Sequence, residues 1–354
     1  MIRFFGVVIL SFALFARLSE AVMPLAIFYS LITPLLGILF LGCFIYEVKN
    51  KQKGYLIIAL IYLTGVISIL SATLQYSITS KTQKSFSVMS YNVSVFNVYA
   101  YLNHNYLESK RLMNWIKQDK TDIYCFQEYY NCDTLMTKEN PDRLFTINKK
   151  LGTEQGYQVY APPFLTNHIG ATFGLAIFSK FPMVHTEMID FKHLGGSTTN
   201  GILIADLKIP HQDTIRIINC HLQSIILDNG EPTKNTFIDK SIASIQKIHK
   251  GAILRSKQID LLTEVIKKSP FPVVVCGDLN ESSYGYAYSQ LQKLLTNGFE
   301  AKGNGFGFTL TALPFRIDQL FFDDNRLKIE SFETNNSQKY SDHYPISARL
   351  SFKN

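Results

Sequence analysis

The chain has 354 residues and a formal net charge of +7, from 35 basic and 28 acidic side chains. This length holds one large domain or two smaller ones, each able to bury a sizeable core. Residues 80–354 carry 30 of the basic and 26 of the acidic side chains, which excludes the concentrated positive field of a dedicated duplex-DNA binder. Nucleic acid is therefore a substrate that the charge allows but does not indicate.

Two long runs near the start of the chain carry no charge. They cover residues 24–46 and 54–80, with 23 and 27 positions. A helix rises about 1.5 Å per residue, so each run is long enough to cross a hydrocarbon core of about 30 Å. A buried core helix is the alternative for one such run, but two in tandem with a short charged link favour a hairpin through lipid.

A shorter apolar run, residues 4–16, lies between Arg3 and Arg17. Such a run is either a signal-like segment or a third span with snorkelling ends, and we expect a span. The predicted anchor therefore covers residues 1–80 and contains two or three transmembrane helices.

The link between the long runs, residues 47–53, contains three lysines and one glutamate. By the positive-inside tendency this link lies in the cytoplasm, so the last helix runs outward. We therefore expect a multi-pass protein of the inner (cytoplasmic) membrane, with residues 81–354 forming an extracytoplasmic, periplasmic domain. Lys81 and Lys84, just beyond the last run, oppose this direction.

After residue 85 the sequence alternates short β-rich runs with helical patterns. The predicted strands cover residues 86–92, 122–128, 174–179, 202–209, 214–221, 273–278, 317–322 and 344–352. Apolar side chains at helical spacing mark two helices, one with Leu112, Trp115 and Ile116 and one with Leu254, Leu261, Leu262 and Val265.

Several strands, such as residues 273–276, are apolar on both faces and should be covered on each side. This predicts a layered α/β architecture. Polar stretches at 131–156, 223–251 and 299–312 are typical of loops over the sheet edges, where substrate selectivity resides.

The five cysteines are typical of small buried hydrophobes and do not form a disulfide framework. They are Cys43 in an apolar run and Cys125, Cys132, Cys220 and Cys276 in or just after strands. The redox compartment is left open.

The clearest chemical signal is the strand at 273–278, which ends in Asp278 and is followed by Asn280. A strand period of two puts these side chains on one face. A carboxylate there can orient and deprotonate water, while a neutral amide can bind a phosphoryl oxygen without added repulsion. A turn-forming Asp and Asn pair is the alternative for this motif alone.

Asn92 and Glu128 each end a predicted strand. Carboxylate and amide oxygens on rigid elements are the ligands of hard divalent cations such as Mg²⁺. Either residue, taken alone, is also compatible with an ordinary polar strand end.

Asp318 lies on the same strand face as Leu320 and Phe322, where a carboxylate needs a partner. The candidate is His343, because a hydrogen bond donated by its ring to Asp318 would hold the imidazole in one tautomer and stabilise its charged form. His221, at the end of another strand, could reach a phosphate or protonate a leaving oxygen, unless it is a structural histidine. The other six histidines lack such a context.

The ordered set of motifs resembles the endonuclease/exonuclease/phosphatase superfamily across residues 86–352. The motifs that carry the resemblance are Asn92, Gln127-Glu128, the run 174–179, Asn219-x-His221-Leu222, Gly277-Asp278-x-Asn280, Ile317-Asp318 and Ser341-Asp342-His343. The chain is most similar to bacterial membrane-anchored members. The resemblance implies a four-layer α/β sandwich, in which two mixed sheets are flanked by helices and the site lies at one rim.

The resemblance also implies roles for single residues. Asn92, Glu128 and Asp342 look like the environment of Mg²⁺, which Mn²⁺ could replace. Asp278 resembles the residue that orients or activates water, Asn280 the phosphate-binding amide, His343 with Asp318 the supported catalytic histidine, and His221 the acid-side histidine. Whether the aspartate or the histidine is the formal base stays open.

Three functions are compatible with these residues. The first is an extracytoplasmic nuclease or phosphodiesterase, the second a lipid headgroup phosphodiesterase or phosphatase similar to sphingomyelinases, and the third an inactive binding domain on a membrane anchor. Every proposed catalytic position holds a competent residue, which disfavours the third. The predicted partners are a phosphoester substrate, from nucleic acid or phospholipid, and the lipid bilayer, with no obligate protein partner evident.

Overall fold

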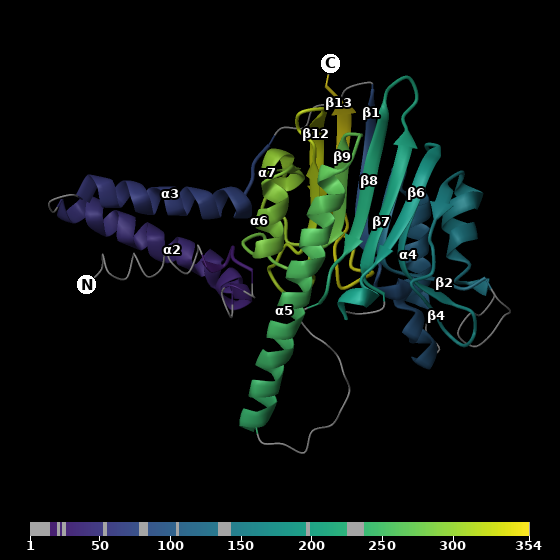
Figure 1. The fold of residues 1–354 in the computed structure, drawn as a ribbon, viewed down its shortest axis with the longest axis horizontal. Coiled ribbons are helices and arrows are strands. Elements are labelled where there is room, and N and C mark those ends of the chain that lie inside the picture. The colour runs from purple at the N-terminus through teal and green to yellow at the C-terminus, as the bar shows by residue number, and fades with distance from the viewer. Residues whose placement is uncertain are drawn as a thin grey trace.

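Two apolar helices precede a β-sandwich in this computed structural model, which describes residues 15–19, 22, 26–51, 55–77, 84–103, 106–133, 143–195, 199–224 and 237–353. The helices α2 (Ala26–Asn50) and α3 (Tyr55–Thr73) lie side by side and project from the sandwich as a hairpin (Figure 1). Nearly all of the predicted first run, residues 4–16, lies outside the described residues.

Small residues let α2 and α3 approach each other closely. A Cβ atom on Gly37 would lie 3.1 Å from Ile69 Cγ2, and one on Gly65 would lie 3.3 Å from the ring of Phe40. Large apolar side chains on the other sides are exposed. By length and composition, Phe28–Asn50 and Leu56–Thr73 could each cross a membrane.

The sandwich consists of two mixed sheets. The seven-stranded sheet has the order β12-β13-β1-β2-β5-β3, with β4 paired to β5, and the six-stranded sheet has the order β10-β11-β9-β8-β7-β6. The first contains β1 (Ser85–Asn92), β2 (Ile123–Asn131), β3 (Gln158–Tyr160), β4 (Leu165–Thr166), β5 (Thr172–Ser179), β12 (Leu327–Thr334) and β13 (Ile346–Phe352). The second contains β6 (Met183–Asp190), β7 (Gly201–Lys208), β8 (Thr214–His221), β9 (Val273–Asp278), β10 (Thr296–Asn297) and β11 (Asp318–Phe322).

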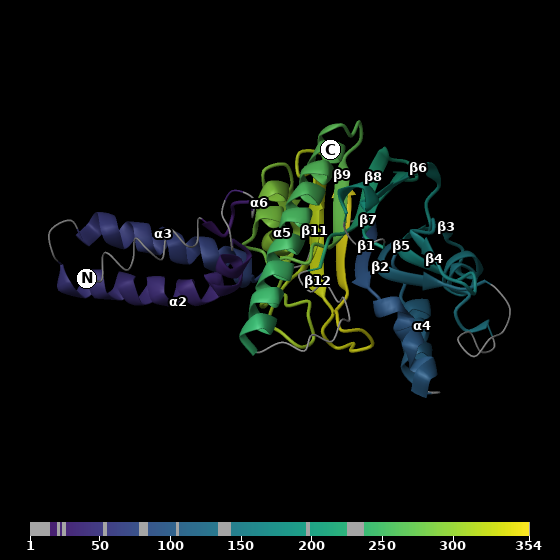
Figure 2. The same cartoon turned by 60° about the horizontal axis from the view of Figure 1, so that its bottom comes forward.

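Helices cover the outer faces of both sheets. The seven-stranded sheet packs on α4 (Leu107–Gln118), and the six-stranded sheet packs on α5 (Phe237–Lys267) and α6 (Tyr286–Gln292). The short helix α7 (Gly298–Lys302) packs beside β11 and β12. Figure 2 shows α5 and α6 on the opposite side of the sheets from α4. The largest apolar cluster lies between the two sheets, so the predicted four-layer α/β sandwich is confirmed.

All eight predicted strands are present, but some elements differ from the sequence analysis. Edge strand β6 was missed because it has no buried residue, and edge strand β12 was missed because polar residues interrupt its apolar pattern. The predicted loop at 223–251 is wrong in its second half, since α5 begins at Phe237. Likewise α7 occupies the start of the predicted loop at 299–312. In both places the polar residues on the exposed side of a helix gave the sequence a composition similar to that of a loop.

The prediction that the cysteines are small buried hydrophobes holds for the four in the sandwich, while Cys43 in α2 is partly exposed. All five are free, and four of them are fully buried in the sandwich.

Candidate active site

Three neighbouring strands of the six-stranded sheet bring three polar side chains to one rim. Strand β8 ends at His221, β9 ends at Asp278, and β11 begins at Asp318. The strand registers pair Asp278 directly with both His221 and Asp318. All three side chains are buried. His221 and Asp318 are 97 positions apart in the sequence. They flank Asp278 because β9 lies between β8 and β11.

The end of β9 requires a glycine next to the aspartate. Gly277 has φ +146°, and a Cβ atom there would lie 1.9 Å from the carbonyl oxygen of Cys220 on β8. Only glycine allows this close approach of the two backbones. The close approach brings His221 next to Asp278.

The seven-stranded sheet contributes Asn92, at the end of β1, and Glu128, within β2. The Asn92 amide Nδ2 donates to Glu128 Oε1 and to Asp278 Oδ2, each at 3.2 Å. Glu128 lies at an irregularity in the pairing of β2 with β5 and has φ +46°. Backbone strain of this kind is found where a side chain must be aimed at a functional site. Asn92 thus connects the two sheets at the rim.

Asp318 and His343 form the hydrogen bond that the sequence predicted. His343 Nδ1 lies 2.8 Å from Asp318 Oδ2, and both side chains are buried. His343 Nε2 lies 3.8 Å from Asp278 Oδ2, and His221 Nε2 lies 3.7 Å from the same oxygen. Two imidazoles therefore face one carboxylate oxygen.

The two oxygens of Asp278 have different surroundings. Oδ1 accepts from the backbone N–H of Asn280 at 2.8 Å, which fixes the rotamer. The Asn280 side-chain Nδ2 donates to the carbonyl of Leu222 at 3.0 Å. An amide carries two N–H hydrogens, so one hydrogen of Asn280 stays available for a ligand.

Burial and neighbouring charges change the pKa values of Asp278 and His343. Burial raises the pKa of Asp278, and the Asp318 carboxylate raises it further, while the imidazoles of His343 and His221 oppose the shift. Burial lowers the pKa of His343, but the carboxylates of Asp318 and Asp278 outweigh burial and raise it to about 10. At neutral pH His343 is therefore an imidazolium held between two carboxylates.

Asp342 is exposed and adjoins the rim through its neighbour Ser341. The Ser341 hydroxyl donates to the backbone carbonyl of Asn92 at 2.8 Å. The carbonyl of Asp342 accepts from the backbone N–H of Thr311 at 2.9 Å. The structure brings Asn92 and Glu128 into direct contact, and it puts Asp342 on the loop beside them.

The donor atoms at this rim fit a divalent cation. Among the described residues, Asp278 and Asp318 bring carboxylate oxygens within 4.8 Å of each other and of the His343 ring, and protonation of that ring leaves the oxygens as the donors. Asp318 Oδ1 is buried and accepts no hydrogen bond from the described part of the chain. Together with Glu128 and Asn92, the rim is rich in carboxylate and amide oxygen, the chemistry that Mg²⁺ and Mn²⁺ prefer.

Sequence reasoning missed the residues that hold these side chains in place. The Thr309 hydroxyl accepts from the backbone N–H groups of Ile317 at 3.0 Å and of Asp318 at 3.1 Å, which fixes the start of β11. Threonine in a predicted loop carries no signal for such a role.

A buried amide pair crosses between the sheets beneath the rim. Gln127 Nε2 donates to Asn219 Oδ1 at 2.7 Å, and Asn219 Nδ2 donates to the carbonyl of Phe126 at 2.9 Å. Both residues belonged to the motifs, and Asn219, two positions before His221, shares its strand face, but nothing in the sequence indicated that the two amides meet. This pair fixes the relative positions of β2 and β8.

Tyr91 was also missed by the sequence analysis. Burial raises its pKa, and the carboxylates of Asp342 and Asp318 raise it further. Its phenol is therefore a neutral group next to the carboxylates at the rim.

A sequence profile of the endonuclease/exonuclease/phosphatase family matches residues 89–217. An endonuclease/exonuclease/phosphatase structure from Beutenbergia cavernae is 17% identical, with a TM-score of 0.55 over 76% of this chain and 72% of that one. The human Nocturnin catalytic domain with bound sulfate is 18% identical, with a TM-score of 0.53 over 78% and 97%.

An endonuclease/exonuclease/phosphatase structure from Bacteroides vulgatus is 15% identical, with a TM-score of 0.54 over 77% of this chain and 100% of that one. A search of curated protein sequences finds no significant match. The profile match covers residues 89–217 of the 354, and the solved structures share the fold that the two sheets and their helices form here. The chain therefore matches the endonuclease/exonuclease/phosphatase family over part of its length and has the fold of these structures, as its ordered motifs indicated.

Proposed function

We propose that this protein is a divalent-metal-dependent phosphoesterase that hydrolyses its substrate with water oriented by Asp278. The family fold supports phosphoester hydrolysis in general. The observation that carries the proposal is the convergence of Asn92, His221 and His343 on Asp278 Oδ2, at 3.2, 3.7 and 3.8 Å. A carboxylate surrounded by donors at a rim can hold water for attack while those donors receive phosphoryl oxygens.

We assign the proton-accepting role to Asp278 and the charge-stabilising role to His343. A raised pKa makes Asp278 a better base than an ordinary aspartate. His343, with a pKa of about 10, is already protonated at neutral pH and cannot accept another proton. Its Nε2–H instead would donate to the phosphoryl group, while Asp318 holds Nδ1.

His221 and Asn280 complete the set. His221 Nε2 faces Asp278 from the side opposite the strand partner Asp318, where it could protonate a leaving oxygen. The remaining amide hydrogen of Asn280 would bind a phosphoryl oxygen. The Asn280 amide is fixed by its bond to the Leu222 carbonyl before substrate binds, which is the condition for electrostatic catalysis.

Glu128, Asn92 and Asp342 would hold the cation, which we propose is Mg²⁺. When bound, the ion supplies positive charge to the phosphoryl oxygens and offsets the repulsion among the carboxylates. Glu128 needs no movement of its backbone to present its carboxylate, since the residue is already held in its strained conformation.

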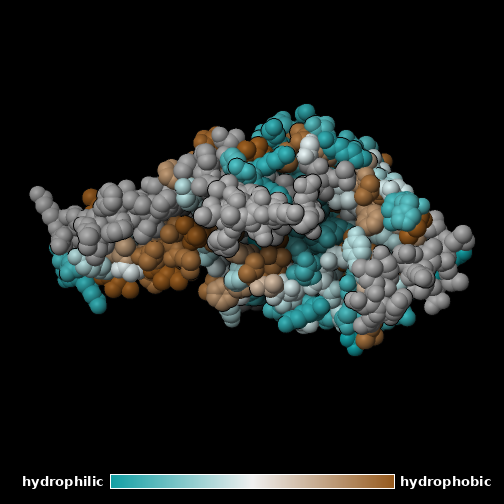
Figure 3. Space-filling model, turned by 90° about the horizontal axis from the view of Figure 1, so that it is seen from below, coloured by the Kyte–Doolittle hydropathy of each residue, from teal (hydrophilic) through white to brown (hydrophobic). Residues whose placement is uncertain are grey.

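We also propose that α2 and α3 anchor the domain in a membrane. The hairpin projects away from the sandwich (Figure 1), and its outward apolar side chains are exposed. Figure 3 shows hydrophobic colour along the hairpin, in contrast to the mixed surface of the domain. A soluble protein rarely exposes an apolar surface of this length.

The full-length protein in detergent, assayed on the soluble diester bis-p-nitrophenyl phosphate, tests the catalytic proposal. We expect EDTA to abolish hydrolysis and Mg²⁺ or Mn²⁺ to restore it. Asp278→Asn should lower kcat at least about 100-fold, the usual contribution of a positioned acid or base. The exposed Asp324→Asn is the matched control, with no expected loss. Full activity in EDTA, or an active Asp278→Asn variant, would contradict the assignment.

A further inference from the structure

We propose that the substrate is a phospholipid headgroup phosphoester, and that residues 303–315 form an interfacial loop that contacts the membrane leaflet. The inference rests on the proposed phosphoesterase function and on the proposed anchoring by α2 and α3. The interfacial loop runs between the exit of α3 and the catalytic rim.

The first end of the interfacial loop is hydrogen-bonded to the chain just after α3. The backbone N–H of Gln75 donates to the carbonyl of Gly305 at 3.0 Å, and the N–H of Gly305 donates back at 2.9 Å. The N–H of Ser77 donates to Asn304 Oδ1 at 2.9 Å. Gln75 is two residues beyond the last residue of α3. If α3 crosses the membrane, Gly305 therefore lies at its surface.

The second end of the interfacial loop supports the catalytic pair. Leu310 forms a β-bridge with His343, and the Thr309 hydroxyl accepts from the N–H of Asp318 at 3.1 Å. Thr309 is four positions after Gly305, and an extended chain covers at most about 3.5 Å per residue, so this stretch spans at most about 14 Å. One short stretch of the loop, with a hydrogen-bonded contact at each end, therefore joins the chain that leaves α3 to the catalytic pair.

A buried arginine fixes this short separation. Arg316, two residues before Asp318, donates from Nη2 to the carbonyl of Ala72 at 2.7 Å, in the last turn of α3. Its guanidinium lies 4.3 Å from the ring centroid of Phe299. The carbonyl end of a helix carries partial negative charge and an aromatic face attracts cations, so both stabilise the buried charge. The end of α3 is thus a structural part of the catalytic rim.

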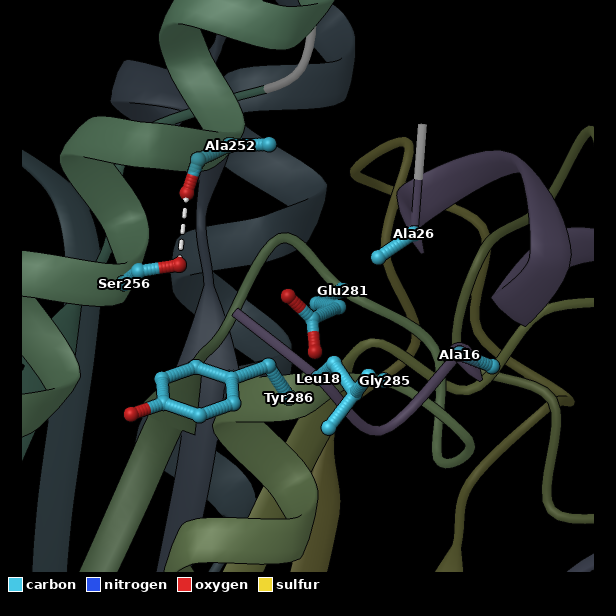
Figure 4. A pocket seen from close by; sticks show the side chains of 8 residues that line it. All are labelled: Ala16, Leu18, Ala26, Ala252, Ser256, Glu281, Gly285 and Tyr286. Atoms are coloured by element: carbon cyan, nitrogen blue, oxygen red, sulfur yellow. Dashed lines mark hydrogen bonds between the residues drawn. The ribbon is translucent and has the colours of Figure 1, made fainter. Parts of the chain in front are cut away.

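Tyr284 adds a second contact of this kind. Its hydroxyl is hydrogen-bonded to the Thr73 hydroxyl, and its ring packs in the apolar cluster of the hairpin. Nearby, residues of the N-terminal segment and of the domain line one pocket, with Ala16, Leu18 and Ala26 facing Glu281 and Tyr286 (Figure 4). The hairpin is therefore packed against the domain through several contacts and is not joined to it by a linker alone.

The surface of the interfacial loop is apolar. Residues 303–315 include no charged side chain. Phe306 and Leu313 are each 53% exposed, and Tyr76, beside the loop, is 91% exposed. Phe306 and Phe308 stack with their ring centroids 5.3 Å apart. Exposed aromatic and aliphatic side chains next to a membrane span are typical of an interfacial contact.

A surface that binds nucleic acid would carry basic side chains in this loop. Binding to a polyanion depends on lysine and arginine side chains that neutralise phosphates, and the interfacial loop offers none. A lipid leaflet needs apolar side chains that enter the acyl boundary while the headgroups stay at the height of the site. Because the loop adjoins both the exit of α3 and the His343–Asp318 pair, a headgroup phosphoester is the substrate that this arrangement brings closest to the rim.

Fluorescence quenching by brominated lipid tests the membrane contact independently of activity. The chain has one tryptophan, so Phe306→Trp in a Trp115→Phe background carries a single indole in the interfacial loop. In vesicles of brominated phosphatidylcholine we expect most of that fluorescence to be lost. Val184→Trp in the same background is the matched control, because Val184 is 61% exposed on β6, at the sheet edge opposite β10. Equal quenching of both variants, or of neither, would overturn the contact.

Activity of the full-length protein in vesicles then tests the substrate. We expect release of phospholipid headgroups, and a fall of about tenfold in the ratio of phospholipid to bis-p-nitrophenyl phosphate hydrolysis for Phe306→Ser with Leu313→Ser, since burial of such side chains is worth about that factor. Val184→Ser should keep the wild-type ratio. Hydrolysis of the soluble diester, DNA or RNA but of no phospholipid would overturn the inference and leave the phosphoesterase standing. Hydrolysis of none of these with Mg²⁺ present would overturn both.

Discussion

The Asp318–His343 pair yields the sharpest prediction, because we expect one hydrogen bond to control both the catalytic rate and the charge of His343. His343 Nδ1 lies 2.8 Å from Asp318 Oδ2, and the pair lies in buried surroundings. The pKa of His343 is about 10 against an ordinary 6.5. At about 1.4 kcal/mol per unit, this difference corresponds to roughly 5 kcal/mol of preference for the imidazolium, shared between Asp318 and Asp278 and opposed by burial.

Asp318→Asn removes the larger of these two contributions while it keeps the shape of the side chain. We expect a loss of at least about 100-fold in kcat/KM, because His343 would lose the carboxylate that orients its ring and that most raises its pKa. His343→Ala should cost a similar factor, and the double variant should be little worse than the worse single variant, since residues that act as a unit give non-additive losses.

The assay is a double-mutant cycle with full-length protein on bis-p-nitrophenyl phosphate, with circular dichroism to check folding. In the EDTA-treated protein, NMR titration should find a lower pKa for His343 in Asp318→Asn than in wild type. Losses that multiply in three folded variants would mean that the two side chains act independently. An unchanged pKa of His343 in Asp318→Asn would refute the electrostatic reasoning.

Three further predictions concern stability and topology. Because the folded-state pKa of His343 is raised, its contribution to stability is fully present below pH 6.5 and is lost as the pH rises through about 10. Urea denaturation of the EDTA-treated protein should therefore show a free energy of unfolding that declines over this window. In Asp318→Asn this decline should be smaller. Gly277→Ala should destabilise the fold by about 3 kcal/mol or more, because its Cβ would meet a backbone carbonyl at 1.9 Å, whereas Gly195→Ala, with φ +78° and open space, should cost about 1 kcal/mol. A C-terminal alkaline phosphatase fusion should be active and a cytoplasmic fluorescent reporter dark, as the lysine-rich link predicts, and the reverse pattern would reverse the orientation.

Much of the candidate site could be predicted because its side chains end or begin strands. Strand periodicity and a motif order shared with a large family are local properties of the sequence. They were enough to name Asn92, Glu128, Asp278, Asp318 and His343, which the structure gathers at one rim. The hydrogen bond between Asp318 and His343 followed from the cost of a lone carboxylate on an apolar face.

The residues that hold the site in place could not be predicted in this way. Thr309, Arg316 and the Gln127–Asn219 pair act through contacts between segments far apart in the chain. Such contacts depend on which elements become neighbours, and composition or period carries no information about that. The stretch 299–312 was predicted as a loop over a sheet edge where substrate selectivity resides, and its first residues belong to α7.

The sequence by itself determined the two apolar helices, the central strands and the chemical character of the catalytic rim, because burial and periodicity impose these patterns residue by residue. Only the tertiary structure decided that β9 lies between β8 and β11, that the end of α3 docks against Arg316, and that an apolar loop joins this end to the catalytic pair. Each of these is a pairing of distant segments, and its stability comes from packing and hydrogen bonds that exist only when the whole chain is folded.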